Sequence, residues 1–206
     1  MKEDDENPPT HATKGDVTRV FALTDGVFAI VITILVLELH VPIFPEDTLF
    51  SSEVTEVGYK LPFYFASLLL AGVYWVGHRN LFSLVKQVDD TLIWLNIMFL
   101  MIAALIPFGV SLLGSYHHTL PLVTCGVLLF LLAGWQLLMY LYVTSHQELI
   151  FNPIYPTQRK RVITYMSIAP VFFLISILCS AFFPYIVINN LLHNTPDISY
   201  PNHPCQ

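Results

Sequence analysis

Charge is scarce in this chain of 206 residues, of which only 12% are Asp, Glu, Lys or Arg. A soluble domain carries about 25% of such residues. Hydrophobic residues make up 55% of the chain, and the few charges sum to a net −6. That balance argues against a nucleic-acid partner, because phosphate binding requires clusters of Lys and Arg. The composition predicts an integral membrane protein whose first partner is the lipid bilayer.

The sequence also lacks the motifs of several large functional classes. It contains neither Gly-x-Ser-x-Gly nor His-Glu-x-x-His, the signatures of serine and zinc hydrolases. The phosphate-binding loop Gly-x-x-x-x-Gly-Lys-Ser/Thr and the carbonyl filter Thr-Val-Gly-Tyr-Gly are absent as well. Only three cysteines occur, without the spacing of metal ligands. We therefore expect no catalytic residue, no metal site and no cofactor.

Long apolar segments dominate what is present. A spanning helix needs about 20 mostly apolar residues, and five segments reach that length: roughly 19–41, 59–82, 91–113, 121–144 and 162–183. Pro107 predicts a kink near the far end of the third segment. A sixth apolar segment, Tyr185–His193, is only nine residues long, so a sixth span there would have to borrow from its flanks. The pattern predicts an all-α integral membrane bundle with a single membrane domain.

Basic residues mark one side of the membrane. Eight of the nine lie before or at the start of the first span or around the connections after the second and fourth spans, and only Lys60 falls on the other side. The positive-inside rule then places the N-terminus in the cytoplasm. With six crossings the C-terminus would return to the cytoplasm, and the acidic connection 42–57 would lie outside.

The first span carries polar residues that are costly inside a membrane and therefore indicate a functional site. On an ideal helix four of its aliphatic side chains fall within about 60° of one another: Leu23, Ile30, Ile34 and Leu37. Thr33 lies beside this stripe, and Asp25 lies on the opposite side. The alternative interpretation is that the stripe only packs against lipid or another helix.

Asp25 needs a partner inside the membrane, because buried polar groups must be satisfied. Arg19 is poorly placed, since six residues along a helix turn it about 120° away. Trp75 and His78 in the second span and Asn96 in the third offer suitable hydrogen-bond donors. We predict that Asp25 is buried in a network with these three side chains. The alternative is that they only anchor helix ends at the interface.

Three ordered motifs carry a family resemblance. Arg19-x-x-x-Leu23-Thr24-Asp25, followed by Gly-Val-Phe-Ala-Ile, resembles the Arg-x-x-x-Phe-Ser-Asp signature of TMEM175-type potassium channels. The segment WVGHRNLF, which includes Trp75 and His78, is similar to the Trp-x-x-His stretch of their second helix. The segment LNIMFLMIAALIPFGVSLLG is similar to their third helix. Leu23 replaces the usual Phe, and Thr24 replaces the usual Ser.

The resemblance implies a fold and a function for the prokaryotic members of this family. It implies six transmembrane helices per subunit and a homotetramer in which helix one lines a central pore for potassium and other monovalent cations. Matched by distance from the motif aspartate, the apolar constriction falls on Ile30, Ile34 and Leu37, and Thr33 beside it contributes to selectivity. We expect residues 1–12 to form a disordered acidic cytoplasmic tail, 13–195 the transmembrane channel domain and 196–206 a short C-terminal tail. The expected location is the bacterial plasma membrane.

Two other functions remain open from the residues alone. A small transporter would move a solute through its own helix bundle, function as a monomer and show saturable uptake. A structural membrane protein would carry out no transport. The channel, by contrast, requires several copies around one axis and passive ion flow down the electrochemical gradient.

Overall fold

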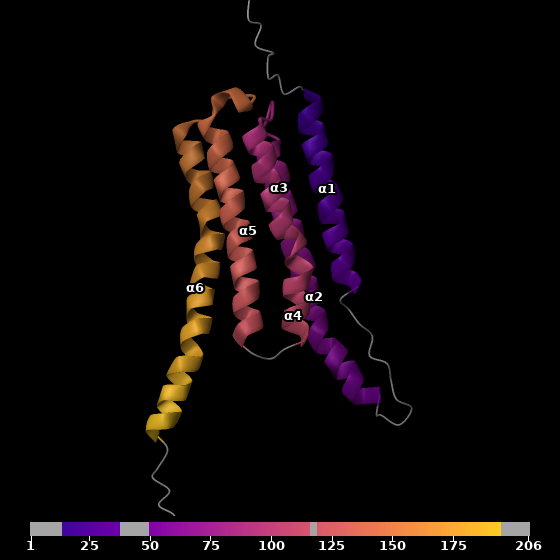
Figure 1. The fold of residues 1–206 in the computed structure, drawn as a ribbon, viewed down its shortest axis with the longest axis vertical. Helices are drawn as coiled ribbons and strands as arrows, with labels where there is room; N and C mark the ends of the chain where they lie inside the picture. Colours follow the sequence, from indigo (N-terminus) through magenta and orange to yellow (C-terminus); the bar gives the residue numbers. More distant parts are fainter. Residues whose placement is uncertain (1–13, 38–49, 116–118, 195–206) are drawn as a thin grey trace, which may run out of the picture.

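The structure is a computed structural model, which describes residues 14–37, 50–115 and 119–194. The described chain is an all-helical bundle of long, roughly aligned helices (Figure 1). Its elements are α1 (Lys14–Leu37), α2 (Phe50–Phe82), α3 (Asp90–Ala104), α4 (Ile106–Ser115), α5 (Thr119–Ser145), the short 3-10 helix η1 (Gln147–Leu149) and α6 (Pro156–Asn194). The predicted tails, 1–12 and 196–206, and the end of the predicted first span lie outside the described residues.

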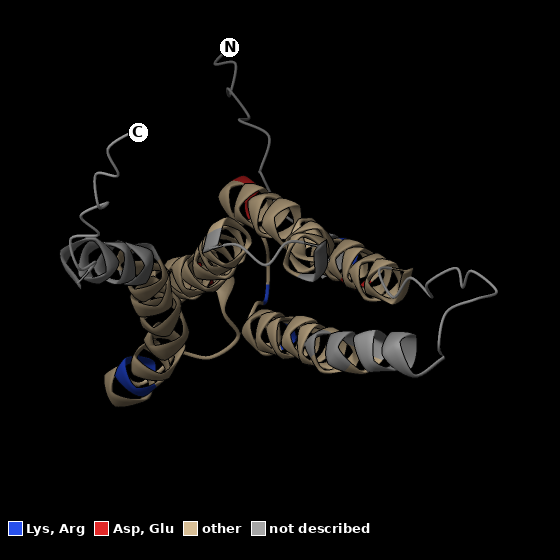
Figure 2. Ribbon diagram, turned by 90° about the horizontal axis from the view of Figure 1, so that it is seen from below, with Lys and Arg blue, Asp and Glu red and all other residues tan. Residues whose placement is uncertain are grey.

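Among the described residues, four segments are long and apolar enough to cross a membrane: Val17–Leu37, Asp90–Leu113, Leu120–Ser145 and Pro156–Ser180. Helix α2 runs antiparallel to α1 beside them and contains the predicted second span (Figure 1). Viewed along the bundle, nearly all of the described ribbon carries no charge (Figure 2). The prediction of an all-α integral membrane protein is confirmed.

The third pass is broken, as Pro107 predicts. Helix α3 ends at Ala104, Leu105 caps it, and α4 begins at Ile106. Proline has no N–H to donate to the carbonyl four residues earlier, and its ring collides with that carbonyl, here Ala103. The chain therefore bends at Leu105 and continues toward the same end of the bundle.

The predicted sixth span does not form as a separate helix among the described residues, and that prediction is wrong there. Residues 185–193 continue α6, which runs unbroken for 39 residues to Asn194. No glycine and no charged residue lies between Val162 and His193, and the helix continues through Pro170 and Pro184. The described helices thus make five passes, with α3 and α4 as one. The start of α1 and the end of α6 lie at opposite ends of the bundle (Figure 1), and the expected return of the chain to its starting side is not found in the described residues.

Two connections are joined at the end of the bundle where α6 begins. Val85, after α2, forms an isolated antiparallel bridge with Ile150, after η1. The Lys86 amide donates to the Leu149 carbonyl at 2.7 Å, and the Phe151 amide donates to the Leu84 carbonyl at 3.1 Å. These bonds tie the α2–α3 connection to the α5–α6 connection.

Candidate functional site

Helix α1 packs on the rest of the subunit through one narrow stripe. Its buried side chains are Val20, Thr24, Phe28, Val31 and Leu35. Their spacing of three and four residues keeps them on one helical face, and this face contacts α2, α3 and α4. The single polar member is Thr24, which is completely buried.

The aliphatic side chains grouped by the sequence lie away from this packing stripe. Ile30 is 58% exposed, Ile34 39% and Leu37 72%. At 100° per residue their face is centred about 110° from the centre of the packing stripe. In the isolated subunit these three side chains therefore remain uncovered, although they lie in one of the most apolar segments of the chain.

Thr33 is exposed on the same side of α1. Its hydroxyl donates to the Ile30 carbonyl at 2.8 Å. A threonine hydroxyl has one proton and two lone pairs. Because the proton is turned toward the helix backbone, the oxygen keeps its acceptor capacity for another group.

A buried polar cluster links α1, α2 and α3. His78 Nε2 lies 2.7 Å from Asn96 Oδ1, and Asn96 Nδ2 lies 3.3 Å from Thr24 Oγ1. Thr24 Oγ1 in turn lies 3.0 Å from the Val20 carbonyl. One assignment gives each of the three side chains a donor or acceptor partner: the imidazole N–H donates to the Asn96 oxygen, the Asn96 amide donates to Thr24, and Thr24 donates to its own helix.

Aromatic rings enclose the histidine of this cluster. The His78 imidazole stacks on Phe82 with ring centroids 4.3 Å apart, and on Phe99 at 5.2 Å. Phe21 of α1 meets it edge-on at 6.4 Å. These aromatic rings keep water away from the imidazole of His78. The hydrogen bond to Asn96 therefore satisfies this buried polar ring.

Asp25 forms a second, separate contact. The indole N–H of Trp75 donates to Asp25 Oδ1 at 2.8 Å, and the Arg79 guanidinium lies 5.9 Å from the centre of the Trp75 ring, within the range of a cation–π contact. Asp25 itself is exposed. The prediction of a buried Asp25 is therefore wrong for the subunit, because α1 turns Thr24, not Asp25, into the bundle.

The predicted partners are thus brought together as two neighbouring contacts in place of one network. Trp75 binds Asp25, while His78 and Asn96 bind each other and Thr24. Arg19 and Leu23 are exposed on α1. Among the described residues no three His, Cys, Asp or Glu side chains gather closely enough to hold a metal ion.

Sequence reasoning gave Thr24 no role beyond the motif, and it missed Gln136. Thr24 was detectable, because it continues the i, i+4 spacing from Val20 to Phe28. Gln136 is a lone amide within a 26-residue candidate span, which is itself a signal for a polar contact. Its amide donates to the Tyr74 carbonyl at 3.1 Å.

Fold and site together define an α-helical integral membrane protein. Its first helix is held by polar contacts near the start and presents a free aliphatic face along its second half.

Comparison with known proteins identifies the family. The family described as endosomal/lysosomal potassium channel TMEM175 matches residues 19–107. A potassium channel of Chryseobacterium sp. (strain P1-3) is 32% identical over 178 residues, which cover 85% of this chain and 87% of that protein. The chain therefore belongs to the TMEM175 potassium channel family.

A more distant relative and a solved structure extend the comparison. The endosomal/lysosomal proton channel TMEM175 of Danio rerio is 26% identical over 156 residues, which cover 73% of this chain but only 29% of that protein. The crystal structure of a lysosomal potassium-selective channel TMEM175 homolog from Chamaesiphon minutus has a TM-score of 0.65 at 22% identity. The structural match covers 88% of this chain and 100% of that chain. At 22% identity it supports the fold alone.

Proposed function

We propose that this protein is a potassium-permeable cation channel through which ions flow passively down their electrochemical gradient. Family membership supports this function, since the Chryseobacterium relative is named a potassium channel. The observation that carries the proposal is the free aliphatic face of α1, formed by Ile30, Ile34 and Leu37. In a monomer this face has no protein partner. In an assembly of several copies around one axis, the same face of each copy lines a central pore.

In the proposed pore these three positions form the constriction. Branched aliphatic side chains cannot replace the hydration shell of an ion. A narrow ring of them stops flow by dewetting, and a wider ring passes hydrated or partly hydrated ions. Outward movement of α1 is then the opening step, and apolar constrictions of this kind need no resident cofactor. Potassium is the permeant species.

Thr33 is the proposed contributor to selectivity. Its hydroxyl proton is engaged by the Ile30 carbonyl at 2.8 Å, so its oxygen is free to face a cation. A ring of such oxygens beside the apolar ring adds ligands that the aliphatic side chains lack.

The proposed assembly is a homotetramer in a bacterial plasma membrane with the start of α1 in the cytoplasm. The concentration of basic residues at one end supports this orientation. With five described passes, the end of α6 is then placed on the outer side. The polar contacts of Thr24 and Asp25 hold α1 to its own subunit, so the aliphatic face is left for the axis.

Current recordings on purified protein in planar bilayers test the function. Under opposed potassium and sodium gradients, the reversal potential should lie closer to the equilibrium potential of potassium than to that of sodium. The current should be proportional to the driving force. Saturable, electrically silent uptake by a monomer would instead support the transporter.

A further inference from the structure

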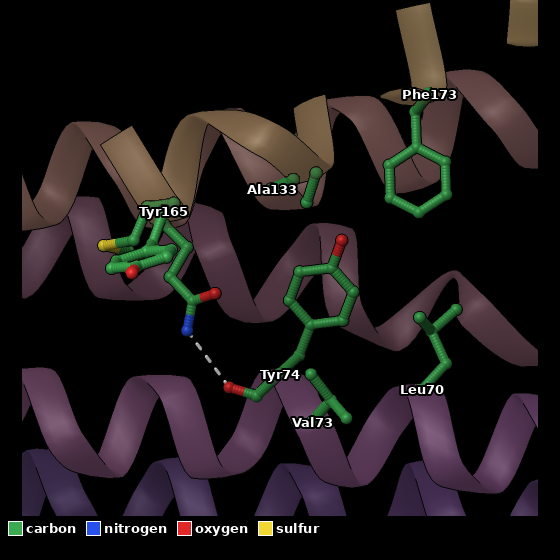
Figure 3. A pocket seen from close by; sticks show the side chains of 9 residues that line it. Leu70, Val73, Tyr74, Ala133, Tyr165 and Phe173 are labelled. Carbon is green, nitrogen blue, oxygen red and sulfur yellow. Dashed lines mark hydrogen bonds between the residues drawn. The ribbon is translucent and has the colours of Figure 1, made fainter. Parts of the chain in front are cut away.

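A cavity of about 170 Å³ lies between α2, α5 and α6, on a different face of α2 from the contacts that hold α1 (Figure 3). Its wall is largely apolar and includes Leu70, Val73, Ala133, Ala169 and Phe173. The cavity lies midway along two candidate spans, Leu120–Ser145 and Pro156–Ser180. It is therefore a site at membrane depth, and nothing in the proposed pore uses it.

The cavity reaches the surface of the subunit between α2 and α6. Helix α6 packs mainly on α5, and Val73 and Tyr165, on the two sides of the opening, are both more than half exposed. Figure 1 places α6 and α1 on opposite sides of the bundle. If α1 lines the axis of an assembly, the α6 side faces outward, where a molecule dissolved in lipid can enter.

One polar side chain in the wall is incompletely satisfied. Gln136 lines the cavity and is only 6% exposed. Its amide nitrogen donates to the Tyr74 carbonyl at 3.1 Å, the dashed line in Figure 3. A carbonyl only accepts, so the nitrogen must face Tyr74, and this fixes which end of the amide is the oxygen. No residue that the structure describes donates a hydrogen bond to that oxygen.

The backbone of α2 makes room for this amide. A Cβ at Gly77 would lie 2.7 Å from Gln136 Nε2 and 3.3 Å from its Oε1, so any larger residue there would displace the side chain. The neighbouring Tyr74 hydroxyl donates to the Leu129 carbonyl at 3.3 Å and has no proton left for Gln136 Oε1. The free acceptor is thus held in place at the wall of an apolar cavity.

We propose that this cavity binds a small apolar molecule that carries one hydroxyl group, with the hydroxyl donating to Gln136 Oε1. The size fits, because an apolar cavity of about 150 Å³ holds benzene. A lipid acyl chain fills the same space but has no donor, so it leaves the buried oxygen unpaired. An unpaired buried acceptor is costly, and this cost selects for the hydroxyl.

A matched pair of photoreactive probes tests the site: 4-azidobenzyl alcohol and 4-azidotoluene, which differ only in the hydroxyl. After irradiation of the protein in lipid nanodiscs, mass spectrometry identifies the labelled residues. We expect labels on Tyr165, Met166 and Phe173. The alcohol should reach the same extent of labelling at a roughly fivefold lower probe concentration, because one net hydrogen bond changes the affinity by about that factor. Unlabelled benzyl alcohol should compete with both probes.

Three variants complete the design. Ala169→Phe fills the cavity and should abolish this labelling, whereas Val171→Phe adds the same ring on the opposite face of α6 and should not. Gln136→Leu should remove the preference for the alcohol. If the labels are spread along α6 in the same way in both Phe variants, the probes do not bind in this cavity, and the proposed site is wrong. Equal labelling by the two probes in the unmodified protein would contradict the proposed hydrogen bond from a ligand hydroxyl, because water then satisfies the Gln136 amide. Since Gln136→Leu also loses the Tyr74 bond, Ala169→Phe is the independent test if that variant misfolds.

Discussion

Trp75 and Asp25 join α2 to α1 through a single hydrogen bond of 2.8 Å between residues 50 positions apart. The bond lies on the exposed edge of the helix pair, next to the buried cluster of Thr24, Asn96 and His78. The two contacts differ in burial, and their removal should therefore differ in cost.

The Trp75–Asp25 bond should contribute modestly to stability. Trp75→Phe removes the donor but keeps a ring for Arg79, and Asp25→Ala removes the acceptor. A double-mutant cycle on the free energy of unfolding in detergent should give a coupling of about 1 kcal/mol, typical of a partly solvated hydrogen bond. Trp94→Phe, at an exposed indole on α3, is the control. A coupling near zero would show that the bond does not hold α1.

The buried cluster should matter more. Thr24→Val keeps the shape of the side chain but leaves the Asn96 amide without its acceptor, which costs about 1–3 kcal/mol. The matched control is Thr33→Val, because Thr33 is exposed and bonds only its own helix. Chemical unfolding of both variants measures the difference. Equal stability of the two would refute a role for Thr24 in attaching α1.

The proposed constriction should respond to polarity. Ile30→Asn, Ile34→Asn and Leu37→Asn keep a similar size but attract water into the ring, so leak current at rest should rise. Ile32→Asn makes the same change at an exposed position on the other side of α1 and should leave the current unchanged. Bilayer recordings on intact oligomers provide the measurement. If all three stripe variants conduct like the unmodified protein, this face does not line the pore.

Selectivity should depend on the Thr33 hydroxyl. Thr33→Val should lower the preference for potassium over sodium several-fold while the oligomer stays stable, because it removes an oxygen and keeps the volume. Thr33→Ser, which keeps the oxygen, should preserve the preference. Reversal potentials under opposed gradients measure it. Loss of selectivity in both variants would point to side-chain packing and not to the hydroxyl.

Topology can be mapped by cysteine labelling in a variant without the native cysteines. An impermeant reagent added to intact cells should label cysteines placed at Glu53 and Asn194 but not one placed at Lys160. Labelling at Lys160 would reverse the orientation. Labelling at Glu53 without labelling at Asn194 would contradict the five passes, since the start of α2 and the end of α6 lie at the same end of the bundle (Figure 1).

Sequence alone predicted most of the scaffold. Apolar length predicted the spans, and Pro107 predicted the break at Leu105, because both depend on local chemistry. The prediction that Trp75, His78 and Asn96 lie close to Asp25 followed from the scarcity of polar groups inside a membrane.

The burial of Asp25 could not be predicted in the same way. The helical wheel places Asp25 opposite the aliphatic face, and its need for a polar partner predicts that it is buried there. The packed stripe in fact runs between the two, through Thr24 and Phe28. Which face of an almost uniformly apolar helix is buried depends on the shapes of α2 and α3, which periodicity does not contain. The uninterrupted α6 was missed for a similar reason, since apolar length does not specify where a helix ends.

The uneven attachment of α1 gives it the mechanics of a lever. Hydrogen bonds at Thr24 and Asp25 join its first half to α2 and α3. Beyond them its buried side chains are the apolar Phe28, Val31 and Leu35. Leu37 lies about 20 Å farther along the axis, at about 1.5 Å per residue. A tilt of about 10° around the polar fulcrum therefore moves Leu37 by about 3 Å, roughly the diameter of a water molecule, and moves Ile30 by only about half as much.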